Sequence, residues 1–191
     1  MKLLLIFIIS MGLYAAQNPK EPAVASGVYI ETNIDYPSDD SMKMESVKYH
    51  YDAGTALSLA IGYQMDRWRF ELEGNHVKDE LAKIADITSA GDLIKTGALA
   101  NVYYSAYNDS KLVSSIGVGA GTTNIKTEDL EINDIAQDEI SENNSFTYEV
   151  GISLGYMVTE DWTWTVKYRY LNVKDLGAGT QTFSLGLRYL F

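Results

Sequence analysis

The chain contains no cysteine and only three prolines in 191 residues. The missing thiols exclude a disulfide framework, a zinc ribbon, a cysteine nucleophile and a cysteine-linked lipid anchor. Basic residues are also scarce, since 15 Lys and Arg stand against 26 Asp and Glu and the net charge is -11. A nucleic-acid surface needs clustered Lys and Arg, so we expect no nucleic-acid partner. The length suits a single domain.

The only long apolar run lies at the N-terminus. Lys2 precedes a stretch of about 11 apolar residues that ends in the small residues Ala15 and Ala16, as in a secretory signal peptide. A spanning helix needs roughly 18 to 20 apolar residues, and an N-terminal membrane anchor is the alternative. We expect residues 1–16 to be a cleaved signal with an approximate cleavage site, residues 17–25 a short periplasmic segment, and residues 26–191 the folded domain.

The folded domain alternates apolar and polar residues with a period of two, which is typical of β-strands with two different faces. Residues 68–73 have the sequence Trp-Arg-Phe-Glu-Leu-Glu, so the apolar side chains share one face and the charges share the other. Each alternating segment is close to the roughly 9 to 11 residues that cross a bilayer as a tilted strand. The eight segments are 26–36, 52–63, the one that starts at Trp68, 95–107, 112–123, 146–156, 162–170 and 181–191.

The connections between these segments alternate in length. Short turns at one end and long loops at the other are typical of outer-membrane barrels, whose short turns face the periplasm. The sequence therefore predicts an all-β fold, an eight-stranded antiparallel up-and-down transmembrane β-barrel with short periplasmic turns and four long extracellular loops. The expected turns are 64–67, 108–111 and 157–161, and the expected loops are 37–51, 78–94, 124–144 and 171–180.

Side-chain size indicates which face of the strands meets lipid. The interior of an eight-stranded barrel is just wide enough to be filled by side chains. The apolar faces carry bulky residues such as Trp68, Trp164 and Phe183, whereas the opposite faces carry Gly, Ala and Ser, as at 54–62 and 117–121, with a few charges. The small and ionic faces fit a narrow lumen. A soluble, lipocalin-like barrel with the apolar face inside is the alternative, and the bulk of that face disfavours it.

Aromatic residues gather near both ends of the expected strands. Rings with a polar tip prefer the headgroup level, so we expect two aromatic belts at the two membrane interfaces; high strand propensity alone would explain their number but not their clustering. The expected belt near the short turns and the C-terminus is Tyr63, Trp68, Tyr104, Tyr156, Trp162, Tyr189 and Phe191, and the belt near the long loops is Tyr36, Phe146, Tyr148, Tyr170 and Phe183.

The inward faces carry a balanced set of charges. A buried unpaired charge costs several kcal/mol, so we expect these side chains to pair, with Glu149 opposite Arg169 on neighbouring strands. By the same counting of turn residues, Arg69, Glu71 and Glu73 lie opposite Gly62, Ala60 and Ser58. The favoured role of the set is to brace and plug the barrel, and an ion path is the alternative. The expected lumen network is Glu31, Arg69, Glu71, Glu73, Glu149, Lys167, Arg169 and Arg188.

The loops offer little chemistry. The two histidines, His50 and His76, lie near the loop side and lack the His-x-Ser spacing of lipid A deacylases, so we expect no catalytic residue and no enzyme activity. We also expect no cofactor and no bound metal, because the longest loop, although acidic, does not match the EF-hand spacing. Its acids suit a solvated loop; calcium or magnesium bridging to lipopolysaccharide, or contact with a basic host ligand, is the alternative. In the second loop, Leu81, Ile84 and Ala85 fall at helical spacing and predict a short helix.

Four segments carry a resemblance to a known family: 62–73, 100–104, 116–121 and 185–191. In these segments the chain resembles the eight-stranded outer-membrane barrels of the opacity-protein and surface-antigen type, with OmpX-like and OmpA-like barrels as cousins. The resemblance covers residues 26–191. It implies that Tyr189 and the terminal Phe191 form the signal read by the barrel-assembly machinery. It leaves the role open, because the family includes adhesins, evasion factors and small pores.

The sequence thus predicts an integral protein of a Gram-negative-type outer membrane. Its expected role is structural or surface-directed: envelope integrity, adhesion or service as a surface antigen through acidic extracellular loops. A low-conductance porin-like channel is the alternative, and a lipid A-modifying enzyme is the third. The expected partners are outer-membrane lipid and lipopolysaccharide, the assembly machinery during insertion, and an unidentified host or surface ligand, with the chain itself a monomer.

Overall fold

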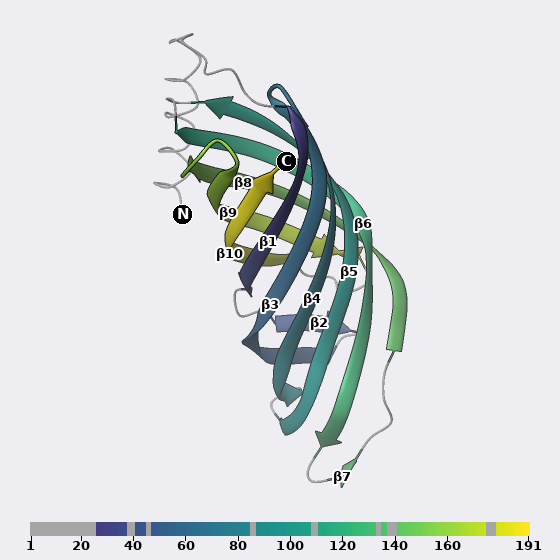
Figure 1. The fold of residues 1–191 in the computed structure, drawn as a ribbon. Coiled ribbons are helices and arrows are strands. Elements are labelled where there is room, and N and C mark those ends of the chain that lie inside the picture. The colour runs from purple at the N-terminus through teal and green to yellow at the C-terminus, as the bar shows by residue number, and fades with distance from the viewer. Residues whose placement is uncertain are drawn as a thin grey trace.

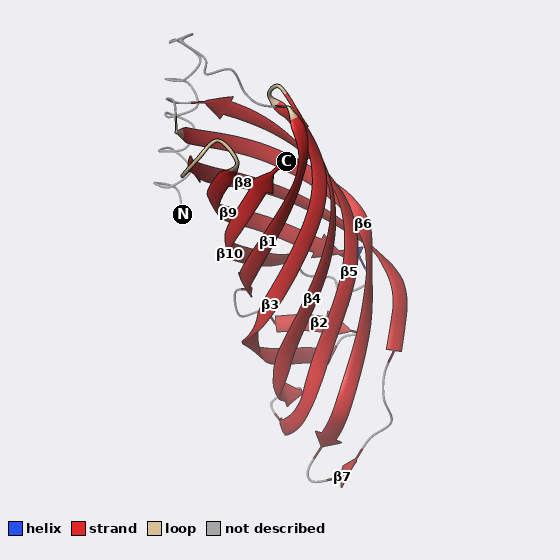
Figure 2. Cartoon of the chain, viewed as in Figure 1, coloured by secondary structure: helices blue, strands red, loops and turns tan. Residues whose placement is uncertain are grey.

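The computed structural model describes residues 26–37, 41–44, 47–84, 87–107, 111–132, 135–136, 141–174 and 179–191. The expected signal peptide and the segment 17–25 lie outside these residues. The described residues form ten strands (Figures 1 and 2). They are β1 (Gly27–Pro37), β2 (Ser41–Met44), β3 (Val47–Met65), β4 (Trp68–Ile84), β5 (Ile87–Tyr107), β6 (Leu112–Ile132), β7 (Ile135–Ala136), β8 (Ser141–Met157), β9 (Trp162–Val173) and β10 (Gly179–Leu190).

Eight of these strands close into a barrel. Each pairs in antiparallel fashion with its neighbour in the order β1-β10-β9-β8-β6-β5-β4-β3, and β1 also pairs with β3. The short strands β2 and β7 add to the loop ends of β3 and β6. Closure leaves the eight-stranded barrel without a free edge, which is the condition for strands to lie in hydrocarbon. The predicted eight-stranded antiparallel up-and-down barrel is therefore confirmed. No helix among the described residues is long and apolar enough to cross a membrane.

Burial alternates along the wall strands in the sense that lipid requires, apart from the three consecutive buried residues Val113, Ser114 and Ser115 near the start of β6. On β1 the pattern of buried and exposed residues switches at each position from Tyr29 to Tyr36. The exposed partners are apolar, as shown by Leu72 on β4 and Trp164 on β9, which are 64% and 58% exposed. The buried partners are mostly polar or charged. An apolar outside with a polar inside belongs to a membrane barrel and not to its soluble counterpart.

The strands differ greatly in length. The long-strand wall, β3 to β6, has strands of 17 to 21 residues, and the short-strand wall, β9, β10 and β1, has strands of 11 or 12. At about 3.3 Å per residue, the longest strand spans roughly 70 Å and the shortest about 36 Å. Figure 1 shows β3 to β6 running well past the loop ends of β9, β10 and β1. Strand β8, with 17 residues, lies between the walls.

This extension changes the expected loops. The second expected loop, 78–94, is largely a hairpin, because β4 continues to Ile84 and pairs with β5 from Ile87. The short helix expected around Leu81 and Ile84 is therefore wrong; Ala85 lies outside the described residues. The physical reason is that the antiparallel ladder satisfies the backbone donors and acceptors of both strands beyond the membrane, whereas three apolar residues at helical spacing supply no competing core.

Two turns set a register that differs from the expected one by two residues. Asp66 adopts a positive φ of 55° in a two-residue turn, which pairs Met65 with Trp68 and puts Glu71 opposite Gly62. The β8–β9 turn pairs Met157 with Thr163, so Glu149 faces Leu171 and not Arg169. The Thr159 hydroxyl accepts hydrogen bonds from the backbone N–H of Asp161 and Trp162 in this turn. A shift of two residues keeps every side chain on its expected face.

Pairing rows climb around the barrel. The row that starts at Trp68, at the turn end of β4, ends at Phe183 and Tyr36, at the loop ends of β10 and β1. Such a stagger is the shear that tilts the strands of a closed barrel. The first barrel strand, β1, starts at the turn end of the barrel, and the last, β10, finishes there. At this end the Phe191 backbone N–H donates a hydrogen bond to the Val28 carbonyl at 2.9 Å.

Candidate functional site in the lumen

The wall strands bring all eight expected ionic side chains into the lumen. Each is between 0 and 7% exposed, although they come from five strands. They form two clusters, one nearer the short turns and one nearer the loops. The strands contribute Glu31 (β1), Arg69, Glu71 and Glu73 (β4), Glu149 (β8), Lys167 and Arg169 (β9) and Arg188 (β10).

The cluster nearer the turns is organised around one acid, and we call it the Glu31 cluster. The Glu31 carboxylate lies 2.7 Å from Lys167 Nζ in an ion pair and accepts a hydrogen bond from Arg188 Nε at 2.9 Å. Arg69 Nη1 lies 3.7 Å from the same carboxylate. Glu71, 3.9 Å from Lys167 Nζ, completes the cluster. One carboxylate thus gathers three cations, and the fixed charges of the cluster sum to +1.

The cluster nearer the loops has the opposite arrangement, and we call it the Arg169 cluster. The Arg169 guanidinium contacts Glu73 at 2.6 Å, Asp35 at 2.9 Å and Glu149 at 3.3 Å. Glu149 reaches Arg169 diagonally, because the two are not cross-strand partners. A planar guanidinium offers five N–H donors, which suits a site with three carboxylates. Asn101 on β5 joins the clusters, since its side-chain amide donates to Glu71 at 3.2 Å and to Glu73 at 3.5 Å.

Asp35 was not among the expected lumen residues, and it makes the two clusters hold five carboxylates and four cations. The expected balance of four and four therefore becomes a net charge of -1 in this part of the lumen. Asp35 shares its strand face with Glu31, four residues away on β1. The two-residue period was the signal that could have identified it.

Two inward tyrosines were also missed. Tyr29 and Tyr103 are buried, and each stands directly opposite a glycine, Tyr29 opposite Gly62 and Tyr103 opposite Gly117. A Cβ atom at either glycine would collide with the facing ring. The glycines therefore make room for aromatic rings in a narrow lumen.

The rings hold a buried cation. The guanidinium carbon of Arg69 lies 4.7 Å from the centre of the Tyr103 ring and 6.0 Å from that of Tyr29. The Tyr29 hydroxyl donates to Glu71 at 2.9 Å. Cation–π contacts of this kind partly replace the water that a buried guanidinium has lost.

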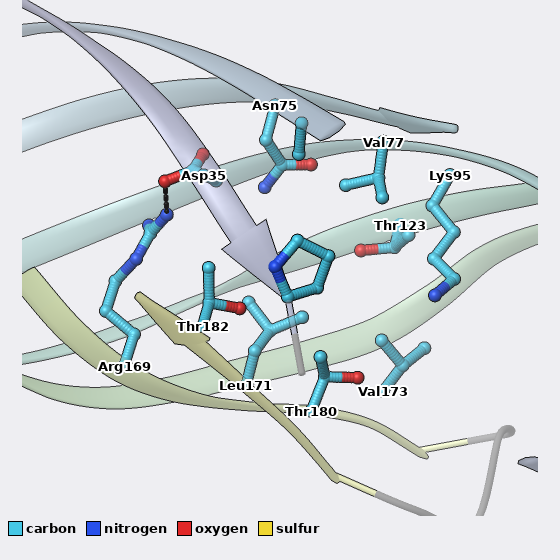
Figure 3. A pocket seen from close by; sticks show the side chains of 12 residues that line it. Asp35, Asn75, Val77, Lys95, Thr123, Arg169, Leu171, Val173, Thr180 and Thr182 are labelled. Atoms are coloured by element: carbon cyan, nitrogen blue, oxygen red, sulfur yellow. Dashed lines mark hydrogen bonds and ion pairs between the residues drawn. The ribbon is translucent and has the colours of Figure 1, made fainter. Parts of the chain in front are cut away.

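A small cavity lies on the loop side of the Arg169 cluster (Figure 3). Its volume is about 60 Å³, enough for a few water molecules and too small for a substrate of ordinary size. Arg169 and Asp35 line one end, and Lys95 lines the other. Lys95 Nζ also contacts Asp79 at 2.7 Å, and Asp79 accepts the backbone N–H of Gly54 at 3.2 Å.

The expected belt residues lie on the outer surface at the two ends. At the turn end, Trp68 packs edge-on against Tyr104 with ring centres 5.0 Å apart, and Tyr189 contacts Trp162 at 4.7 Å and Phe191 at 4.9 Å. The other turn-end members are Tyr63 and Tyr156. At the loop end, the expected members lie on β1, β8, β9 and β10 only: Tyr36, Phe146, Tyr148, Tyr170 and Phe183.

The histidines do not assemble a catalytic group among the described side chains. His76 faces outward, where its Nδ1 lies 3.2 Å from the Thr96 hydroxyl, while Asp79 faces the lumen. The two residues that are close in sequence therefore lie on opposite faces of β4. The side chain of His50 is outside the described set. Within the described residues, no group of three or more Cys, His, Asp or Glu side chains could hold a metal ion.

A closed antiparallel barrel with an apolar outside and an ionic lumen defines the chain as a transmembrane β-barrel. The family model described as the outer membrane protein beta-barrel domain matches residues 3–191. The chain belongs to this family, and the expected family relationship is confirmed. Membership implies a location in the outer membrane. A search of the curated proteins found no match.

Three solved structures illustrate the likeness. Neisserial surface protein A (NspA) is 17% identical, with a TM-score of 0.60 over 87% of this chain and 98% of that one. The outer membrane protein OprG from Pseudomonas aeruginosa is 17% identical, with a TM-score of 0.61 over 87% and 96%. Ail, the attachment invasion locus protein of Yersinia pestis, was solved with the heparin analogue sucrose octasulfate; it is 15% identical, with a TM-score of 0.54 over 87% and 97%. At these identities the likeness concerns the fold alone.

Proposed function

We propose that the protein is a closed, non-conducting barrel that serves the outer membrane as a structural and surface-interaction element, with its loop end outside the cell. The possible forms of that role are envelope integrity, adhesion and service as a surface antigen. The observation that carries the proposal is the lumen, where two ion-paired clusters join opposite walls of the barrel.

The burial of these charges favours a brace over an ion path. A conducting lumen keeps its charged side chains in water, whereas the nine charges of the two clusters are almost completely buried and paired. Breaking a buried pair by removing one partner costs several kcal/mol, so these contacts resist opening. The cavity beside Arg169 favours a low-conductance pore, because it leaves the lumen unfilled on the loop side of the Arg169 cluster.

The projecting long-strand wall supports the surface role. Beyond the expected membrane span, β6 carries Glu128, Asp129 and Glu131. The further acids Asp134, Asp138 and Glu139 of the same expected loop lie outside the described residues. Ail was solved with a sulfated, anionic ligand, but an acidic projection would repel such a ligand. A basic surface ligand is the partner that this charge favours.

No catalytic activity forms part of the proposal, because His76 and Asp79 face opposite sides of the wall. A hydrolase of lipid A needs its catalytic base and acid on the same face of the barrel wall. If the purified barrel hydrolysed lipid A and His76→Ala abolished that hydrolysis, this part of the proposal would be wrong.

Conductance in a planar lipid bilayer tests the plugged lumen. We expect no reproducible open state for the native protein, and new openings for Arg169→Ala. Lys111→Gln, which removes an exposed charge at the turn end, is the matched control and should behave like the native protein. A native open state that changes with Glu71→Gln would instead establish the pore.

Binding of intact cells to a basic ligand tests the surface role. Neutralising Glu128, Asp129 and Glu131 together as Gln, Asn and Gln should weaken binding severalfold and make the remainder less sensitive to salt. The control neutralises Glu160 and Asp161 in the turn between β8 and β9. Equal losses in both variants, at equal surface expression, would contradict a role for the projection.

A further inference from the structure

Among the side chains that the structure describes, the loop-end aromatic belt has no member on β4, β5 or β6. Its five members lie on β1, β8, β9 and β10. The pairing rows climb from β4 toward β8, so Phe146 and Tyr148 lie higher in the barrel than the residues of β4 to β6 in their own rows. The residues of β4 to β6 that lie at the same height as Phe146 and Tyr148 are therefore nearer the loop ends of their strands. At that height the outward side chains described on β4 to β6 include His76, Lys78 and Asn124, and none of those described there is aromatic.

Two lysines replace the rings. In the register of the wall, Lys78 on β4 pairs with Ile94 on β5, which pairs with Lys126 on β6. We call these three residues the lysine row. All three face outward, and with strands about 4.8 Å apart the two lysines stand roughly 10 Å from one another. Few cations are available to this acidic chain, since four of its 15 basic residues belong to the two lumen clusters.

Lys78 is exposed on the outer surface of the wall. Its side chain is 53% exposed even though its ammonium contacts Asp92 at 2.6 Å. On β5, Asp92 lies two residues beyond Ile94 toward the loop end, and it pairs with Glu128 on β6. These acids border the lysine row on the side away from the membrane, so an anion approaching the lysines is directed to the membrane side of the row.

The outer surface is shallow further down, on the turn side of the row formed by His76, Thr96 and Asn124. The outward residues there are small, with Gly74 paired to Ala98 and Ala100 paired to Ala120. A Cβ atom built at Gly74 meets nothing within 4 Å. The exposed side chains of Leu72 on β4 and Tyr148 on β8 flank these small residues. An acyl chain can lie in such a hollow, in contact with the backbone of β4 to β6.

We propose that this sector holds one phosphorylated lipid of the outer leaflet, lipopolysaccharide, with a headgroup phosphate on the lysine row and an acyl chain over Gly74, Ala98 and Ala120. Headgroup phosphate and lysine attract one another at an interface by about 1 kcal/mol per lysine. The aromatic belt anchors the short-strand wall at the headgroup level, and the bound lipid gives the long-strand wall an equivalent anchor. The placement rests on the proposed outward position of the loop end.

The test uses the full chain folded in a neutral detergent and titrated with purified lipid A, followed by native mass spectrometry. We expect lipid A to bind at least roughly tenfold more tightly than its dephosphorylated form, and the double variant Lys78→Gln/Lys126→Gln to lose that preference. Lys111→Gln removes the same charge at the turn end and should keep it. A heat-dependent gel shift verifies that every variant is folded.

A second pair of variants tests the hollow. Ala98→Leu and Ala120→Leu should each weaken lipid A binding several-fold, whereas Ile116→Leu, on the outer face near the turns, should leave it unchanged. The proposal is wrong if the double lysine variant binds lipid A like the native protein, or if a chelator of divalent cations abolishes binding that the lysine variant retains. It is also wrong if native protein forms a dimer that Ala120→Leu dissociates, because a second copy would then occupy the hollow. Detergent binding does not depend on sidedness or conductance, so these outcomes are separate from those of the proposed function.

Discussion

The two walls of this barrel share one pattern of alternation and use it differently. The short-strand wall supplies Glu31, Asp35, Lys167, Arg169 and Arg188 to the lumen and ends in aromatic rings at the loop side. The long-strand wall supplies facing charges and small side chains, and then continues beyond the membrane as a charged hairpin surface. The outward residues decide the difference: a strand stays in lipid while they are apolar and leaves it where they become charged.

Contacts across the lumen connect the two walls, and Arg169 makes three of them. The largest loss of stability should therefore come from removing the Arg169 side chain. Arg169→Ala leaves Asp35, Glu73 and Glu149 without their cation and should lower the free energy of unfolding by about 3 to 5 kcal/mol. Insertion should persist, because the apolar outer face is unchanged. Urea unfolding in lipid vesicles and the melting temperature on a heat-dependent gel measure the effect. Melting identical to that of Lys111→Ala, an exposed control, would show that Arg169 does not couple the walls.

The fit of rings against glycines should come next in size. Gly117→Ala on β6 places a methyl group against Tyr103 and should destabilise the barrel by about 1 to 3 kcal/mol. Gly74→Ala makes the same change on the outward face of β4, where the space is open, and should be neutral or slightly stabilising. In a double-mutant cycle, Tyr103→Ala should relieve most of the cost of Gly117→Ala. Equal costs for the two glycine changes would remove this distinction between lumen and outer face.

The turn-end belt should matter more for assembly than for stability. Phe191→Ala removes the ring contact with Tyr189 and should cost about 1 kcal/mol or less in purified protein. In cells it should slow insertion severalfold, because Tyr189 and Phe191 are the predicted assembly signal. Pulse-chase measurement of the folded fraction tests this, with Phe183→Ala toward the loop end of β10 as control. If both variants assemble at the native rate, the terminal ring is not the signal.

The smallest effect should come from the projecting hairpin. Lys78→Ala breaks the partly exposed pair with Asp92 and should change the free energy of unfolding by about 1 kcal/mol or less, because solvent screens the lysine. Lys167→Ala, in the lumen, is the buried comparison and should cost several-fold more. A large loss for Lys78→Ala would mean that the projection contributes to the stability of the barrel itself.

Much of the architecture could be predicted because alternation is a local property. In the segment that starts at Trp68, successive side chains point to opposite faces, so the apolar residue of each neighbouring pair faces lipid and the charged one faces the lumen. The loop regions were harder, since the extended part of β4 up to Ile84 has no apolar face to mark it as a strand. Its conformation depends on pairing with β5, which is a non-local contact.

The candidate site was predictable in membership and not in geometry. The two-residue alternation along the strand alone assigned Lys167 and Arg169 to the lumen. The same rule applied to β1 would have added Asp35 and Tyr29. The contacts were a different matter, because Arg169 and Asp35 are 134 residues apart and meet only after the barrel closes.

By itself, the sequence determined an inside-out barrel: small and ionic residues alternate with bulky apolar ones, and each strand carries that information within its own few residues. The tertiary structure decided which charges meet, where the two tyrosines fit, and how far the long-strand wall projects. The reason is that register depends on the number of residues in each turn, such as the two-residue turn at Asp66, and on the closure of β1 onto β3. A shift of two residues keeps the face and changes every partner.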